Sequence, residues 1–60
     1  MFIVTLVHLN IKHFLRGTTW TGSLDRAFKY DTEEQAAAAL VKAAQFMKPS
    51  QVKKCLIEKV

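Results

Sequence analysis

Residues 32–48 (TEEQAAAALVKAAQFMK) constrain the fold of this chain most, because they form its only long segment with one clear periodicity. At about 100° per residue, this segment carries a single apolar stripe along one side. The stripe consists of Ala36, Leu40, Ala43 and Met47. We therefore predict one amphipathic helix over residues 32–48, with the rest of the chain built to cover it.

The two ends of this helix carry consistent signals. Thr32 and Gln35 have the spacing of a capping box, and Pro49 disfavours helical backbone at the residue before it. The apolar arc is wider than the ~100° usual for a surface helix. Alanine tolerates exposure and explains part of that width. For Val41 and Phe46, which also widen the arc, we expect a second surface that packs against the helix.

A chain of 60 residues makes one domain, residues 1–60. Such a domain buries only about 60% of its unfolded surface. Oligomerisation is then the expected source of further stability, and we predict a homodimer. The single cysteine rules out an internal disulfide and fits a reducing compartment. The apolar start, MFIVTLVHL, is too short to span a bilayer and lacks the basic region of a signal peptide. We expect a cytoplasmic protein.

Three segments have the composition of β-strands. Residues 2–9 are apolar on both faces, which is typical of a central strand. Asn10 is expected to form a turn into residues 11–16, whose charges suggest an edge strand. Residues 17–22 (GTTWTG) are expected to be a loop, and residues 52–60 the last strand. A right-handed crossover places that strand beside the first and antiparallel to it. The sequence predicts an α+β fold of ββαβ order, with a three-stranded antiparallel sheet (order 2-1-3) and one helix on one face.

One helix can cover only one face of that sheet. We expect the side chains of Phe2, Val4 and Leu6 to pack on the alanine stripe, where small residues leave room for them. An uncovered apolar face usually marks an interaction surface. The open face of the first strand, and with it the expected dimer interface, contains Ile3, Thr5 and Val7.

Trp20 has two interpretations. Its indole can close one end of the core, as a large aromatic residue does in a small domain. It can also be a hot spot of an interface, where tryptophan is enriched. Trp20, Val41 and Phe46 therefore join the open sheet face as candidate interface residues.

The sequence contains no convincing catalytic, cofactor or metal set. His8, His13 and Cys55 leave a structural zinc site one ligand short. Cys55 lies between hydrophobic residues, which fits an inert core thiol better than a nucleophile. Gly17 and Gly22 lack the spacing and the lysine of a phosphate-binding loop. We predict a protein that is not an enzyme and that has no cofactor and no metal site.

The run WTGSLDRAFKYDTEEQA resembles a pattern of small phage and prophage accessory proteins. The matching positions are Trp20, Thr21, Leu24, Ala27, Phe28, Thr32 and Ala36. The resemblance covers residues 20–37 and, loosely, the strands around them. Some phage proteins of this size inhibit bacterial antiviral systems by binding a defence protein. The resemblance therefore implies a partner in the host-cell cytoplasm, and it carries over no catalytic residue.

A different class of function is the alternative. The net charge of +4 permits contact with nucleic acid without requiring it. Phe14 on a sheet face could stack on bases, as in single-strand binders. The basic residues that would accompany it are Lys48, Lys53, Lys54 and Lys59. These lysines also fit a solvated surface that keeps the protein soluble.

Overall fold

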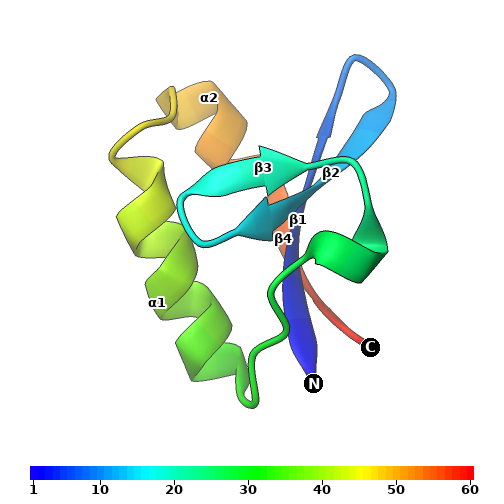
Figure 1. The fold of residues 1–60 in the computed structure, drawn as a ribbon. Coiled ribbons are helices and arrows are strands. Elements are labelled where there is room, and N and C mark those ends of the chain that lie inside the picture. Colours follow the sequence, from blue (N-terminus) through cyan, green and yellow to red (C-terminus); the bar gives the residue numbers. More distant parts are fainter.

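A four-stranded antiparallel sheet and one long helix make up the fold of the computed structural model, which describes residues 1–60 (Figure 1). The elements are β1 (Phe2–His8), β2 (Ile11–Arg16), β3 (Thr19–Thr21), the 3₁₀ turn η1 (Leu24–Arg26), α1 (Glu33–Ala44), α2 (Pro49–Val52) and β4 (Cys55–Lys59). The strand order is β3-β2-β1-β4. The α+β class and the antiparallel sheet are confirmed, with β4 beside β1, but the sheet has four strands where we predicted three.

The additional strand is β3, inside the segment 17–22 that we predicted to be a loop. Arg16 pairs with Thr19, so only Gly17 and Thr18 form the turn between β2 and β3. Gly17 has a φ of 67°, a conformation that glycine adopts without strain. The Thr-Trp-Thr run that follows favours the strand. Because β3 covers the outer side of β2, the prediction that β2 is an edge strand is wrong.

The turn between β1 and β2 holds a residue in an unfavourable conformation. Leu9 and Asn10 have φ values of 51° and 63°, as in the two-residue turns that suit a twisted hairpin. Asn10 was expected here, but β1 ends at His8 and Leu9 belongs to the turn. A left-handed backbone costs a residue other than glycine or asparagine about 1–2 kcal/mol. Leu9 is also 80% exposed, so its side chain gains little from packing.

We expect Leu9→Asn to stabilise the fold by about 1 kcal/mol, because asparagine tolerates the left-handed conformation. The check is the midpoint of urea unfolding at one fixed protein concentration. Leu24→Asn is the control, since Leu24 is also exposed and lies outside the positive-φ turn. A Leu9→Asn midpoint at or below that of the unchanged protein would show that the turn stores no strain.

Helix α1 begins as predicted and ends earlier. The N–H of Gln35 donates to Thr32 Oγ1 at 3.1 Å, and Gln35 Oε1 accepts from the N–H of Asp31 at 3.0 Å. The helix stops at Ala44, four residues before the predicted Lys48. Pro49 opens α2, a short helix that was not predicted, because proline suits the first position of a helix. As a consequence β4 starts at Cys55 rather than at residue 52.

The core lies between α1 and the sheet. Val4, Leu15, Ala36 and Ala43 are its buried members, and Phe2, Leu40 and Met47 are among the side chains packed against them. The predicted alanine stripe and the predicted inward set of β1 are therefore confirmed.

The opposite face of the sheet is only partly open, contrary to the prediction. Ile3 and Thr5 are buried, with exposed fractions of 3% and 2%. Figure 1 shows η1 on the side of the sheet opposite α1, and Ala27, which follows η1, is buried as well. The chain then reaches β1, where Tyr30 exchanges two backbone hydrogen bonds with Phe2, each of 2.7 Å. The segment after β3 thus covers one end of the face that we predicted to be uncovered.

Candidate functional site

A cleft of about 230 Å³ opens on the α1 side of the sheet, between the β1–β2 hairpin and the connection from α1 to α2. Three parts of the chain contribute to it: the hairpin, β3, and the segment from the end of α1 to α2. Its walls are Leu6, His8, His13, Trp20, Phe46, Met47 and Gln51. We call this the histidine–aromatic cleft.

The strand register places both histidines in this cleft. His13 pairs with Leu6 and His8 pairs with Ile11, so the two imidazoles lie diagonally on neighbouring strands. Residues directly opposite in an antiparallel pair share a face, and Leu6 fixes that face as the one toward α1 because it is buried and lines the cleft. Trp20 lies on β3, where it pairs with the buried Leu15 of β2 and therefore faces the same side of the sheet. The cleft therefore depends on the strand that the sequence did not reveal.

The other wall exists because α1 ends at Ala44. Phe46 and Met47 follow in the turn, where Met47 packs against the core and Phe46 is left 75% exposed. Gln51 comes from α2, and its Oε1 accepts from the N–H of Lys48 at 3.3 Å. Because α1 ends before Phe46, this residue lies on the rim of the cleft and not on the helix.

The chemistry of the cleft suits binding. Leu6, Met47 and the Trp20 indole offer apolar contact, and the imidazoles of His8 and His13 can donate or accept hydrogen bonds at its edge. An apolar cavity with a few polar groups at its edge is the usual form of a ligand site. No group of three His, Cys, Asp or Glu side chains lies close enough to hold a metal ion.

Cys55 lies on the same face of the sheet as Leu6, with which it pairs. Its Sγ contacts the carbonyl oxygen of Gln51 at 3.4 Å. Burial raises the pKa of this thiol, which keeps it protonated at neutral pH and weakens it as a nucleophile. The geometry is that of a packed thiol, half-buried at the edge of the core.

A second and larger hollow, of about 430 Å³, lies between the β2–β3 turn and α1. Phe28 and Tyr30 form one wall, with their rings edge to face at 6.4 Å, and burial raises the pKa of the Tyr30 hydroxyl. The wall on α1 includes Ala38, Ala39 and Lys42. This hollow is lined by two aromatic rings and by Gln35 and Lys42, but it lacks the paired imidazoles and the strongly exposed rim aromatic residue of the histidine–aromatic cleft.

The candidate interface residues do not form one surface. Trp20 and Phe46 meet in the histidine–aromatic cleft. Val41 lies 69% exposed on α1, whereas Val7 is 46% exposed on the opposite face of the sheet, and Ile3 and Thr5 are buried there. His8 and His13 were not among the predicted site residues. Side chains alternate between the two faces of β1 and β2, and this alternation places His8 and His13 on the same face as Leu6. It is the sequence signal from which the two histidines could have been predicted.

The residues of the nucleic-acid alternative are also divided. Phe14 pairs with Thr5 on the face away from α1, and Lys12 Nζ already lies 5.8 Å from the centre of its ring. Lys59 pairs with Phe2 on the other face. Lys48, Lys53 and Lys54 flank α2. No single surface therefore combines the aromatic ring with the four lysines.

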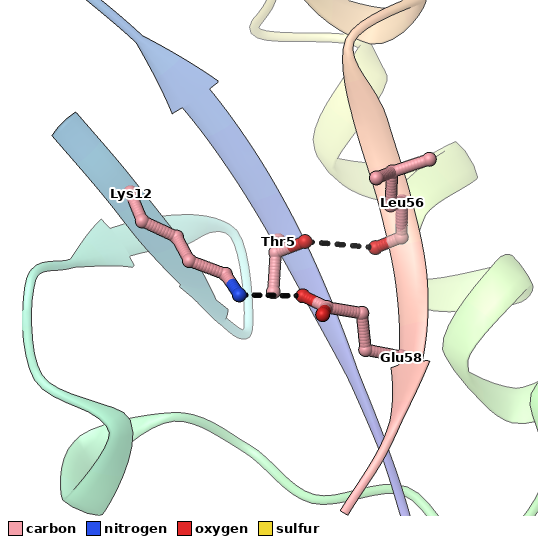
Figure 2. Close-up of polar contacts among 4 residues, drawn as sticks. All are labelled: Thr5, Lys12, Leu56 and Glu58. Carbon is pink, nitrogen blue, oxygen red and sulfur yellow. Dashed lines mark hydrogen bonds and ion pairs between the residues drawn. The ribbon is translucent and has the colours of Figure 1, made fainter. Parts of the chain in front are cut away.

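An ion pair crosses the face away from α1. Lys12 Nζ on β2 lies 2.9 Å from Glu58 Oε2 on β4, and Figure 2 shows the contact passing over Thr5 on β1. Thr5 Oγ1 donates to the carbonyl oxygen of Leu56 at 3.4 Å. The Lys12 ammonium lowers the pKa of the Glu58 carboxyl, and the nearby Thr5 hydroxyl contributes to the same direction. The pair ties together the three adjacent strands β2, β1 and β4.

This ion pair predicts a small loss of stability in acid. Because the pKa of Glu58 is lower in the folded state, its contribution is complete above the ordinary value of about 4.3 and disappears as the pH falls below it. We expect less than ~1 kcal/mol, since the pair is partly exposed. The measurement is urea unfolding at neutral pH and in acid. The difference between the unchanged protein and Glu58→Gln should shrink as the pH falls, and a constant difference would contradict the assignment.

No helix of the structure has the length and apolar character needed to cross a membrane. The chain matches no protein-family model, and no curated protein or solved structure is significantly similar to it. The site must therefore be interpreted from its own geometry.

Proposed function

We propose that this chain is a non-enzymatic binding protein that takes an apolar side chain of a partner protein into the histidine–aromatic cleft. The observation that carries the proposal is the position of Phe46, which is 75% exposed on the rim of a cleft that also holds Trp20 and Met47. Exposed aromatic residues beside a pocket are typical of the centres of protein interfaces. Trp20 fits both interpretations of this residue, as a core side chain and as an interface side chain, since it packs against the core and lines the cleft.

The partner in this proposal is a bacterial host protein of antiviral defence, and the chain inhibits or modulates it by occupying one of its surfaces. This step rests on the resemblance of residues 20–37 to small phage accessory proteins. We propose that the protein acts in the host cytoplasm as a homodimer, since a 60-residue domain gains stability by association.

The proposal is tested by capture of a partner from bacterial lysate, comparing the unchanged protein with Phe46→Ala. A hot-spot residue contributes 2 kcal/mol or more, so we expect Phe46→Ala to weaken binding by about 30-fold or more. Phe28→Ala is the matched control, because Phe28 is an aromatic residue that is 49% exposed and lies outside the cleft. Equal loss in both variants, or no loss in either, would contradict the proposed site.

The same experiment separates the protein partner from nucleic acid. Contacts to phosphates release counterions, so binding to nucleic acid falls steeply with added salt. We expect capture to survive nuclease treatment and moderate salt, since the cleft is largely apolar. Capture that disappears with nuclease would favour the lysines around α2 as the functional surface.

A further inference from the structure

The outer edge of β4 offers unpaired backbone groups. At the end of the β1–β4 pair, the N–H of Val60 donates to the carbonyl oxygen of Met1 at 2.8 Å, and the Met1 amine donates to the carbonyl oxygen of Val60 at 3.3 Å. Bonded and non-bonded positions alternate along an antiparallel pair. The backbone groups of Glu58 and Leu56 therefore point toward β1, and those of Cys55, Ile57 and Lys59 point outward, where no other strand lies.

We infer that this edge pairs with the same edge of a second copy of the chain, in antiparallel orientation. In the register that we propose, Cys55 exchanges backbone hydrogen bonds with the partner's Ile57, and the two-fold axis passes between two copies of Leu56. Leu56 is 62% exposed in the single chain. The two copies of Leu56, which are otherwise exposed to water, would thus contact each other at the axis. A two-fold interface uses the same surface on both copies, as this contact does.

The charges along the edge divide in the proposed register, because Lys54 lies opposite the partner's Glu58 whereas Lys59 lies opposite the partner's Lys53. Edge lysines usually discourage pairing between strands, and Lys54 lies just before β4. In the proposed register, however, Lys54 lies opposite the partner's Glu58. Opposite charges in directly opposed positions favour a strand pair, and like charges oppose it. Lys53 is the C-cap residue of α2, so of the two pairs the attractive one lies nearer to β4.

The position of α1 gives an independent reason for a second copy. This helix packs over β1 and β4. In a sheet continued through two β4 strands, both helices lie on the same side, about two strand spacings or ~10 Å apart. That spacing is close to the 8–10 Å between the axes of packed helices. The continued sheet would therefore bring the two α1 helices into contact.

The side of α1 that would meet the second helix is apolar and uncovered. Ala38, Ala39 and Lys42 line the hollow with Gly17 and Thr18, so they mark the side toward β2 and β3. The other side carries Val41, which is 69% exposed, with alanines at positions 37 and 44 that allow close approach. In the proposed dimer, the second α1 helix would be the surface that we expected to pack against Val41.

The inference deepens the proposed self-association by naming its surface, and it rests on that part of the proposed function. It does not depend on the histidine–aromatic cleft, which lies between the β1–β2 hairpin and the connection from α1 to α2. A dimer formed through β4 would leave one cleft open on each copy. Failure of either proposal can therefore be recognised separately.

The register is tested by a disulfide across the axis. Directly opposed residues at a non-bonded position have Cα atoms about 4.5 Å apart, within the 4.4–6.8 Å range of disulfides. Leu56→Cys, in a Cys55→Ala background, is expected to form a covalent dimer under mild oxidation. Lys54→Cys in the same background is the control and should stay largely uncrosslinked, because it faces the partner's Glu58. Equal crosslinking of the two variants, or none at position 56, would overturn the register.

The helix contact is tested by light scattering at matched protein concentrations. Val41→Lys is expected to raise the dissociation constant of the dimer at least ~10-fold, because it brings like charges together. Ala38→Lys adds the same charge on the other side of α1 and should leave the constant unchanged. A monomer at high micromolar concentration in the unchanged protein would overturn the self-association itself. A dimer that ignores Val41→Lys and forms no disulfide at position 56 would overturn the β4 edge alone.

Discussion

Replacing Leu15 by alanine is expected to remove a large part of the stability of this domain. The Leu15 side chain is fully buried, with 0% of its surface exposed, between β2 and the alanines of α1. Truncating a buried leucine costs about 2–5 kcal/mol, because the transfer energy is lost and a cavity remains. A domain of this length has roughly 3–9 kcal/mol of stability in total. The loss is therefore of the order of half the stability of the domain.

The measurement is the urea midpoint from circular dichroism at one fixed concentration, because association makes stability concentration-dependent. Leu24→Ala makes the same truncation at a residue that is 44% exposed on η1. It should change the free energy of unfolding by no more than ~0.5 kcal/mol. If Leu15→Ala shifted the midpoint as little as Leu24→Ala does, the core would not lie where we place it.

Ala43→Asp is expected to prevent folding. Ala43 is 1% exposed where α1 meets the sheet, and no cation among the core residues could pair with a carboxylate there. An uncompensated buried charge costs about 3–5 kcal/mol. The helix dipole adds to this cost, since a negative charge is unfavourable near the C-terminal end of a helix.

The matched control is Ala38→Asp, which introduces the same side chain on the exposed side of the same helix. We expect it to keep the far-ultraviolet helical signal and a cooperative unfolding transition, whereas Ala43→Asp loses both. A folded Ala43→Asp protein would mean that the alanine stripe does not pack on the sheet.

Periodicity alone predicted which sides of α1 and β1 face each other in the core. The stripe through Ala36 and Ala43 and the inward set of β1 could be assigned because a helix and a strand each repeat their faces at a fixed interval. The spacing of Thr32 and Gln35 indicated a capping box at the start of this helix. These elements set the side of the sheet on which the core lies, and both are confirmed.

Short elements escaped prediction because their signals are local and weak. Three residues give β3 too few positions for an alternation, and two flanking glycines made the segment resemble a loop. Leu9 could not be expected in a left-handed turn, since its own preference opposes it. Pro49 correctly indicated the end of a helix, but it also began α2, which the same residue type permits at the first helical position.

The candidate site depended on these missed elements. Trp20 and Phe46 were each singled out from the sequence, but they meet only because β3 is a strand and α1 ends at Ala44. The same two features place His8 and His13 opposite Phe46 rather than in open solvent. A site built across three separate parts of the chain cannot be derived from the periodicity of any one of them.

The central claim is that a partner enters the histidine–aromatic cleft, and Trp20 allows it to be tested directly. It is the only tryptophan of the chain, so incorporating 5-fluorotryptophan gives a single ¹⁹F resonance inside the cleft. Adding the captured, unlabelled partner is expected to shift or broaden this resonance in the unchanged protein, and to do so in Phe46→Ala only at much higher partner concentration. An unchanged Trp20 resonance, at a partner concentration where the complex forms, would contradict the claim.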